Sequence, residues 1–480
     1  MKSTKKKIGL FLGPLLFILV KFFFHPEGLD ASANAILAST AWVAVWWITE
    51  AIAIPVTALL PIILFPLSGG LSLGDTTASY GHKYIFLFLG GFIIAITIEK
   101  WNLHKRIALN IIKVVGTNIN KIILGFMMAT ALLSMWISNT ATAVMILPVG
   151  IAIVLQLEDN PNTNINENLI FGKALMLAIA YSASIGGIAT LIGTPPNLVL
   201  AGIVESTYHT EITFAQWFMF GFPISVLLLF ICWFYLTRFA FKFEQKEFPG
   251  GQQEIDKQLE ALGKISYEEK VISIVFSITA LAWISRSFIL VKWLPAIDDT
   301  IIAIIAAITL FLIPDAKKSK ALISWNDAVK LPWGILLLFG GGMALARGFE
   351  VSGLADWIGH QLTSLVGMSI FLLLLILIAA VNFLTEITSN MATTAMLLPV
   401  LISLAAVLNV HPYILLVSAT LAASCAFMLP VATPPNAVVF GSGYLKIEDM
   451  VKKGIWMNVI SIILVTLVVY FILPLIWDLN

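Results

Sequence analysis

Charged residues are scarce in this chain: Lys, Arg, Asp and Glu make up 11% of its 480 residues, whereas soluble domains carry about 25%. Hydrophobic residues make up 59%. Apolar stretches of about 20 residues, the helical length that crosses a bilayer, recur from end to end. The composition excludes a soluble domain of useful size and predicts an all-α polytopic membrane protein.

Cysteine and the common catalytic motifs are also nearly missing. Only Cys232 and Cys425 occur, both in apolar stretches, where a thiol behaves as a small hydrophobe. Neither a disulfide framework nor a zinc site is indicated. The sequence has no His-Glu-x-x-His, Gly-x-Ser-x-Gly or Walker motif. An enzyme or an ATP-driven pump is therefore disfavoured, and coupling to an ion gradient or to counter-exchange remains.

About eleven apolar stretches are predicted to span the membrane. They are 8–24, 34–49, 51–67, 84–100, 172–205, 213–240, 269–292, 299–314, 332–349, 412–440 and 455–477. The first follows four lysines and resembles a signal peptide, but no small-x-small cleavage site follows promptly. We therefore expect it to remain as an uncleaved helix.

Two further apolar blocks, 121–156 and 369–408, are too long for one crossing, and each has a polar break in its middle. The breaks are Ser138-Asn139-Thr140 and Ser389-Asn390-Met391. Each arm is about 16–19 residues long, close to the length of one crossing. We interpret the blocks as re-entrant helical hairpins; two complete spans joined by a loop are the alternative.

Lysine and arginine gather in some loops and avoid others. With a cytoplasmic N-terminus, the predicted inside loops contain Lys105, Arg106, Lys317, Lys318 and Lys320, while the outside loops are almost free of them. The positive-inside rule therefore predicts an N-terminus inside and a C-terminus outside. We expect the protein to lie in the plasma membrane. This topology requires both hairpins to leave on the side they entered.

Three motifs occur twice and in the same order. Residues 88–99 parallel 339–350, and 138–148 parallel 389–399, both at an offset of 251 residues. Gly193-Thr-Pro-Pro-Asn197 parallels Ala432-Thr-Pro-Pro-Asn436 at an offset of 239. Five predicted crossings separate the two Ser-Asn breaks, and an odd number places them on opposite membrane faces. The sequence therefore predicts an inverted repeat, which is common in transporters.

The repeat suggests a division of the chain into five parts. These are first-half scaffold helices at 1–120, a first-half transport region at 121–242, a cytoplasmic linker at 243–270, second-half scaffold helices at 271–365 and a second-half transport region at 366–480. Each transport region would contain one hairpin and one broken helix, at 172–205 and 412–440.

Helix-breaking polar residues at membrane depth are tolerated where the exposed backbone lines a cavity. Pro195 and Pro434 stop their helices and free carbonyl oxygens, which suit a hard cation such as Na⁺. The helix that resumes offers N-terminal amides to an anion. Two such sites would bind the two ends of a dianion. For one Ser-Asn-Thr motif alone, helix packing is the simpler explanation, but two symmetric copies favour binding.

Two further charged residues lie inside apolar segments. Glu386, three residues before Ser389, is either functional or a buried acceptor that caps the hairpin break. Arg347 is expected to snorkel to the membrane surface or to pair with Glu350 rather than to bind an anion.

At these motifs the chain resembles the divalent anion/sodium symporter family, whose members carry di- and tricarboxylates such as succinate, malate, fumarate, 2-oxoglutarate and citrate. The resemblance covers essentially the whole chain. It implies a homodimer in which each protomer has a scaffold domain and a moving transport domain, an elevator mechanism, and Na⁺ as the coupling ion with no organic cofactor.

The resemblance also implies site residues. A first sodium site would contain Ser134, Ser138, Asn139 and Gly193, and a second would contain Thr385, Thr388, Asn390 and Ala432. The substrate would contact Asn139, Thr140, Thr194, Pro195, Asn390, Met391, Thr433 and Pro434. Met391 departs from the family pattern, which often has Thr there, so a hydroxyl is lost. A sodium-independent exchanger of the same fold, a membrane-embedded enzyme and a passive anion channel are the alternatives to a sodium symporter.

Overall fold

The structure, a computed structural model, describes residues 4–116, 118–157, 166–243, 251–363 and 367–479. Within these ranges the regular secondary structure is helical; the isolated bridges include that between Pro314 and Ala321. Among the described residues, eight helices are long and apolar enough to cross a membrane, and several shorter apolar helices accompany them. The predicted all-α membrane fold is confirmed, whereas the number of crossings stays a prediction.

The first half of the chain begins with short and long helices that precede the first hairpin. They are α1 (Thr4–Phe23), α2 (Ala31–Thr49), α3 (Ile54–Thr57), α4 (Leu60–Ser68), α5 (Leu73–Ala78), η1 (Ser79–Gly81), α6 (Lys83–Lys100) and α7 (Leu103–Val115). The predicted span 51–67 is thus two helices instead of one. Pro55 and Pro61 stand at the first turns of α3 and α4, where a missing N–H is tolerated.

The first hairpin and the helices after it complete this half. They are α8 (Ile119–Ser134), α9 (Asn139–Leu155), α10 (Glu167–Gly187), α11 (Pro195–Tyr208), α12 (Phe214–Tyr235) and the π-helical turn η2 (Leu236–Ala240). The helix break predicted within 172–205 lies between α10 and α11. The predicted linker contains α13 (Gly251–Ala261), which packs against α7 and α9, while its residues 244–250 lie outside the described ranges.

The second half repeats this order. Its first helices are α14 (Tyr267–Ser285), η3 (Arg286–Leu290), α15 (Val291–Trp293), α16 (Asp299–Leu312), α17 (Trp325–Ala328), α18 (Trp333–Val351) and α19 (Leu354–Gln361). Its hairpin and later helices are α20 (Ile370–Thr385), α21 (Asn390–Leu408), α22 (Pro412–Ala423), α23 (Pro434–Phe440), α24 (Ile447–Leu467), η5 (Val468–Ile472) and α25 (Leu473–Ile476).

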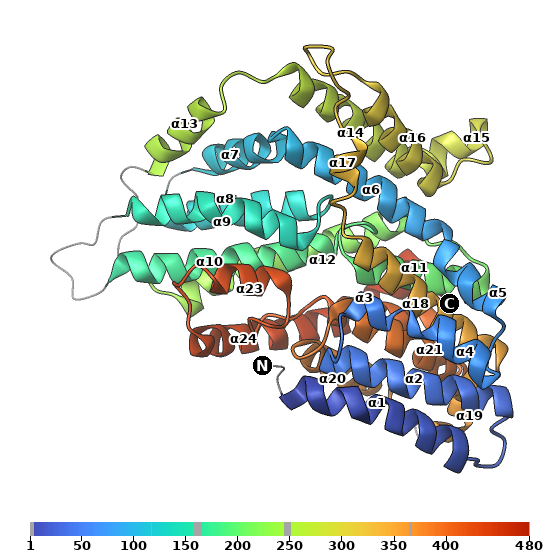
Figure 1. The fold of residues 1–480 in the computed structure, drawn as a ribbon. Coiled ribbons are helices and arrows are strands. Elements are labelled where there is room, and N and C mark those ends of the chain that lie inside the picture. The colour runs from blue at the N-terminus through green and yellow to red at the C-terminus, as the bar shows by residue number, and fades with distance from the viewer. Residues whose placement is uncertain (1–3, 117, 158–165, 244–250, 364–366, 480) are drawn as a thin grey trace.

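The two halves pack in matching ways. Within each half, the first hairpin arm packs against the helix that precedes the break, α8 against α10 and α20 against α22. Between the halves, α9 packs against α23, and α21 packs against α11. Figure 1 shows α8, α9 and α10 side by side, with α23 and α24 next to them. Each hairpin therefore contacts the broken helices of both halves.

Candidate binding site at two helix interruptions

The first hairpin turns between Ser134, the last residue of α8, and Asn139, the first of α9. Ser138 caps α9 because its hydroxyl accepts the backbone N–H of Ala141 at 3.2 Å. The Ser134 hydroxyl lies 2.7 Å from the carbonyl oxygen of Ala183 in α10 and 2.5 Å from Oδ1 of Asn139. The hairpin tip is thereby attached to the helix that precedes the break.

The side-chain amide of Asn139 lies among oxygen atoms. When the amide is turned so that its nitrogen faces them, it donates to the carbonyl oxygens of Ala183 at 3.1 Å and Gly193 at 3.3 Å and to the Ser134 hydroxyl at 2.5 Å. When its oxygen faces them instead, that oxygen lies close to three other oxygens. Such a group of oxygens is stable only around a donor or a cation, and this donor set suits a hard cation.

The second hairpin repeats this arrangement. The Thr385 hydroxyl donates to Oδ1 of Asn390 at 2.8 Å and lies 3.0 Å from the carbonyl oxygen of Ala423. Thr385 and Asn390 follow Ser134 and Asn139 by 251 residues each, and Ala423 follows Ala183 by 240. The sequence repeat is therefore also a repeat of side-chain contacts.

Asparagines of the Thr-Pro-Pro-Asn motifs hold the two helix breaks in shape. Asn197 donates its amide to the carbonyl oxygens of Gly187 at 3.2 Å and Thr190 at 2.8 Å. Asn436 donates in the same way to Ala426 at 3.3 Å and Leu429 at 3.0 Å. Both side chains are fully buried. Because the helix-ending carbonyls have no partner within the helix, these amides supply one.

The two hairpin tips are attached to their breaks by different groups. In the first half the Thr190 hydroxyl donates to the carbonyl oxygen of Met135 at 2.5 Å. In the second half Glu386, the residue equivalent to Met135, accepts the backbone N–H groups of Phe427, Met428 and Leu429 at 2.8, 3.0 and 3.0 Å.

Asn458 of α24 donates a fourth hydrogen bond to Glu386 at 2.7 Å. Glu386 is 3% exposed. A buried carboxylate is tolerated when several donors satisfy it. Of the two roles considered for Glu386, these contacts favour the capping role. Arg347 pairs with Glu350 at 3.0 Å, as expected.

The remaining predicted site residues differ in exposure. Thr194 and Thr433, which precede the proline pairs, are each 3% exposed, and Met391 is 4% exposed. Thr140 and Pro434 are exposed, and Asn139, Asn390 and Pro195 are half-buried. The Thr388 hydroxyl contacts the Leu384 carbonyl at 2.9 Å and the Thr393 hydroxyl at 2.6 Å. The Thr388 hydroxyl is therefore engaged by neighbouring groups of its own hairpin.

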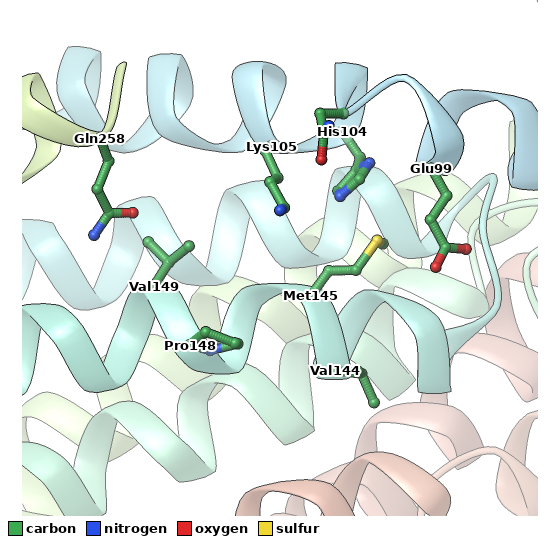
Figure 2. Close-up of a pocket in the computed structure, with 9 residues that line it drawn as sticks. Glu99, His104, Lys105, Val144, Met145, Pro148, Val149 and Gln258 are labelled. Atoms are coloured by element: carbon green, nitrogen blue, oxygen red, sulfur yellow. The ribbon is translucent and has the colours of Figure 1, made fainter. Parts of the chain in front are cut away.

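A cleft of ≈560 Å³ lies along α9 beyond the first tip. Its lining residues come from the end of α6, the start of α7, α9 and α13, and they are Glu99, Asn102, His104, Lys105, Val144, Met145, Pro148, Val149 and Gln258. Figure 2 shows Lys105 and His104 above Met145 and Pro148. The cleft opens beside α13, at the end of the molecule predicted to be cytoplasmic.

Sequence reasoning missed several residues of this arrangement. Ala183 and Ala423 contribute only carbonyl oxygens, so their side chains carry no signal. Asn197 and Asn436 were part of a recognised motif, yet their structural role depends on carbonyls from a preceding helix. Asn458 lies 72 residues after Glu386, near the start of the apolar run 455–477. An amide side chain in such a run was the one available signal.

Comparison with known proteins identifies relatives that are membrane transporters. A family model described as the sodium:sulfate symporter transmembrane region matches residues 4–477. The sodium-dependent dicarboxylate transporter SdcS of Staphylococcus aureus strain MRSA252 is 49% identical, covering 99% of this chain and 92% of the relative. SdcS of Staphylococcus saprophyticus is 48% identical, covering 97% of this chain and 91% of the relative.

Two solved transporter structures share the fold at low sequence identity. MtrF of Neisseria gonorrhoeae aligns with a TM-score of 0.56 and 14% identity, covering 98% of this chain and 96% of MtrF. The YdaH transporter of Alcanivorax borkumensis aligns with a TM-score of 0.58 and 12% identity, covering 84% and 88% of the two chains.

Proposed function

The chain belongs to the divalent anion/sodium symporter family, and we propose that it is a Na⁺-coupled symporter of C4 and C5 dicarboxylates. It is a membrane transporter and not an enzyme. The observation that carries the proposal is the repeated contact of a hydroxyl, an asparagine amide and an alanine carbonyl at Ser134, Asn139 and Ala183 and at their second-half equivalents.

Each repeated contact supplies a sodium site. In the first, the hydroxyl of Ser134, the amide oxygen of Asn139 and the carbonyl oxygen of Gly193 are the ligands, with Ser138 beside them. In the second, Thr385, Asn390 and the carbonyl oxygens of Thr388 and Ala432 take these roles. Sodium binding would require the Asn139 amide to turn its oxygen toward the ion, whereas without the ion its nitrogen would donate to the surrounding oxygens.

The dicarboxylate binds between the two tips. The helices α9, α11, α21 and α23 all begin at the interruptions. The first backbone N–H groups of α9 and α21 have no partner within the helix, whereas α11 and α23 begin with two prolines each, which carry no N–H. Such N-termini favour anions through their partial positive charge. Asn139, Thr140, Thr194 and Pro195 would contact one carboxylate, and Asn390, Met391, Thr433 and Pro434 the other. Because Na⁺ sits next to each carboxylate, binding of the ion and of the anion is mutually favourable.

The movement is of the elevator type. The scaffold consists of residues 1–120 and 271–365, and the transport region consists of residues 121–242 and 366–480. The scaffold forms a homodimer in the plasma membrane, with N-termini inside and C-termini outside. The cleft beside α13 would then connect the site to the cytoplasm in the conformation described.

Counterflow of labelled succinate into proteoliposomes tests this function. We expect uptake that requires an inward sodium gradient and saturates with succinate. A panel of malate, fumarate, 2-oxoglutarate and citrate identifies the preferred anion. Uptake that does not depend on sodium but requires internal dicarboxylate would identify an exchanger instead. Flux that does not saturate with substrate concentration would identify a channel.

A further inference from the structure

Six charged residues form one cluster at the end of the molecule opposite α13. They come from the starts of α6 and α16, the end of α11, the segment after it, and η3. They are Lys83, Glu205, Glu211, Arg286, Asp298 and Asp299. Lys83 contacts Glu205 at 2.6 Å and Asp298 at 3.0 Å. Arg286 contacts Glu211 at 2.8 Å and Asp299 at 3.2 Å.

The cluster joins the two regions that the proposed mechanism sets in relative motion. Glu205 and Glu211 belong to the transport region, whereas the other four residues belong to the scaffold. Among the residues that the structure describes, the ion pairs between these two regions all lie here. The His82 imidazole also lies 4.0 Å from a carboxylate oxygen of Glu205. Other pairs, such as Lys100 with Asp327 and Lys173 with Asp449, stay within one region.

We propose that this cluster is an ionic clasp that holds the transport region against the scaffold in the conformation described and releases it during transport. The proposal rests on the proposed function, because it requires the two regions to move apart. The clasp differs from the sodium and substrate sites in chemistry. Among the described residues, no hydrogen bond or ion pair joins its six residues to the hairpin tips at 134–139 and 385–390.

Each cation in the clasp contacts two carboxylates. One belongs to the transport region and would move away with it, and the other belongs to the scaffold and would stay beside the cation. When Glu205 departs, Lys83 keeps Asp298, and when Glu211 departs, Arg286 keeps Asp299. This matters because Arg286 is only 9% exposed and Asp299 only 2%, and breaking a buried ion pair is costly when one charge is left alone. The departing Glu205 and Glu211 are 26% and 24% exposed, so water reaches both already.

The balance of charge also favours reversible contact. Four carboxylates meet two cations, so the clasp carries two excess negative charges while it is closed. Burial alone would raise the pKa of Asp298, but the backbone N–H of Thr300 and the Lys83 ammonium hold the pKa below its usual value, so this residue stays charged. Removal of Glu205 and Glu211 leaves two neutral pairs in the scaffold. The mutual repulsion of the acids therefore offsets part of the attraction that closes the clasp.

Cysteine accessibility in the cleft tests the clasp. Val144 lines the cleft and is 50% exposed, while the two native cysteines are fully buried. The rate of maleimide labelling of Val144→Cys in proteoliposomes, with a membrane-permeant reagent, therefore reports how often the cleft is open. In the Glu205→Gln, Glu211→Gln background we expect labelling to slow by roughly threefold or more, because the population shifts away from the clasped conformation.

A matched control is Asp449→Asn in the same Val144→Cys background. Asp449 pairs with Lys173 at 2.9 Å and is 27% exposed, like Glu205, but both residues lie in the transport region. We expect this control to label at the parent rate. Unchanged or faster labelling in the clasp variant, or an equal change in the control, would overturn the proposal. Labelling needs neither substrate nor a sodium gradient, so a failure of the symport assay is distinguishable from a failure of the clasp.

Discussion

Glu386 accepts the backbone N–H of Leu429 at 3.0 Å, so a carboxylate at one hairpin tip holds the break of a helix 43 residues further along the chain. The first half has no acidic residue at the equivalent position, where Met135 offers its carbonyl oxygen to Thr190. The two binding halves thus reach a similar arrangement through different chemical groups. This asymmetry leads to the first prediction.

We predict that Glu386→Gln destabilises the protein and impairs sodium-dependent uptake. A glutamine has one acceptor oxygen where the carboxylate has two, and its NH₂ group faces buried backbone donors. Leaving a buried donor unpaired costs about 1–3 kcal/mol. Thermal unfolding of the purified protein measures the loss. Glu50→Gln is the control, because Glu50 is 55% exposed and its pair with Lys6 is long at 3.5 Å; an equal loss in both variants would contradict the capping role.

We predict that Asn139→Ala and Asn390→Ala abolish transport while the protein remains folded. Each change removes the side-chain amide that meets the hydroxyl of Ser134 or Thr385 at its hairpin tip. Counterflow of labelled succinate measures the effect, and size-exclusion chromatography checks the fold. Asn110→Ala is the matched control, because Asn110 is exposed and donates only to the Arg106 carbonyl in its own helix. Normal kinetics in both tip variants would refute the site assignment.

We predict that Thr385→Val weakens sodium activation by ~10-fold, since one interaction of this kind is worth about 1–1.5 kcal/mol. Valine keeps the shape of threonine but removes the hydroxyl that meets Asn390. The measurement is the sodium concentration that gives half-maximal uptake. Thr385→Ser keeps the hydroxyl and should stay close to the parent protein. If valine and serine behaved alike, Thr385 would have no part in cation binding.

We predict that Gly193→Ala eliminates uptake. A Cβ at this position would lie 2.6 Å from the carbonyl oxygen of Gly187, and backbone atoms cannot move aside as a flexible side chain can. The helix break must then open, and the carbonyl oxygen of Gly193 moves away from Asn139. Gly81→Ala is the control because no atom lies within 4 Å of its Cβ position. Wild-type uptake in Gly193→Ala would exclude a close-packed break at this site.

Much of the fold follows from local sequence. The helix break before each Ser-Asn motif and the break before each proline pair were predicted, because proline removes a backbone donor and polar residues are rare in apolar helices. Membrane character and the family resemblance likewise required only composition and motif order. The two helices α3 and α4 were predicted as one span because their prolines lie in an uninterrupted apolar run.

The sequence by itself determined which residues interrupt the helices. In lipid the backbone N–H and C=O groups must be hydrogen-bonded within the protein, so a helix can end only where its residues permit it. Tertiary structure decided what the interruptions contact. Three sets of contacts join segments that lie far apart in the chain. They are the hydrogen bonds to the carbonyl oxygens of Ala183 and Ala423, the hydrogen bond from Asn458 to Glu386, and the charge cluster around Lys83 and Arg286. Every residue has the same backbone carbonyl group, so the sequence does not show which carbonyls accept hydrogen bonds from the hairpin tips. The packing of α8 on α10 and of α20 on α22 decides this.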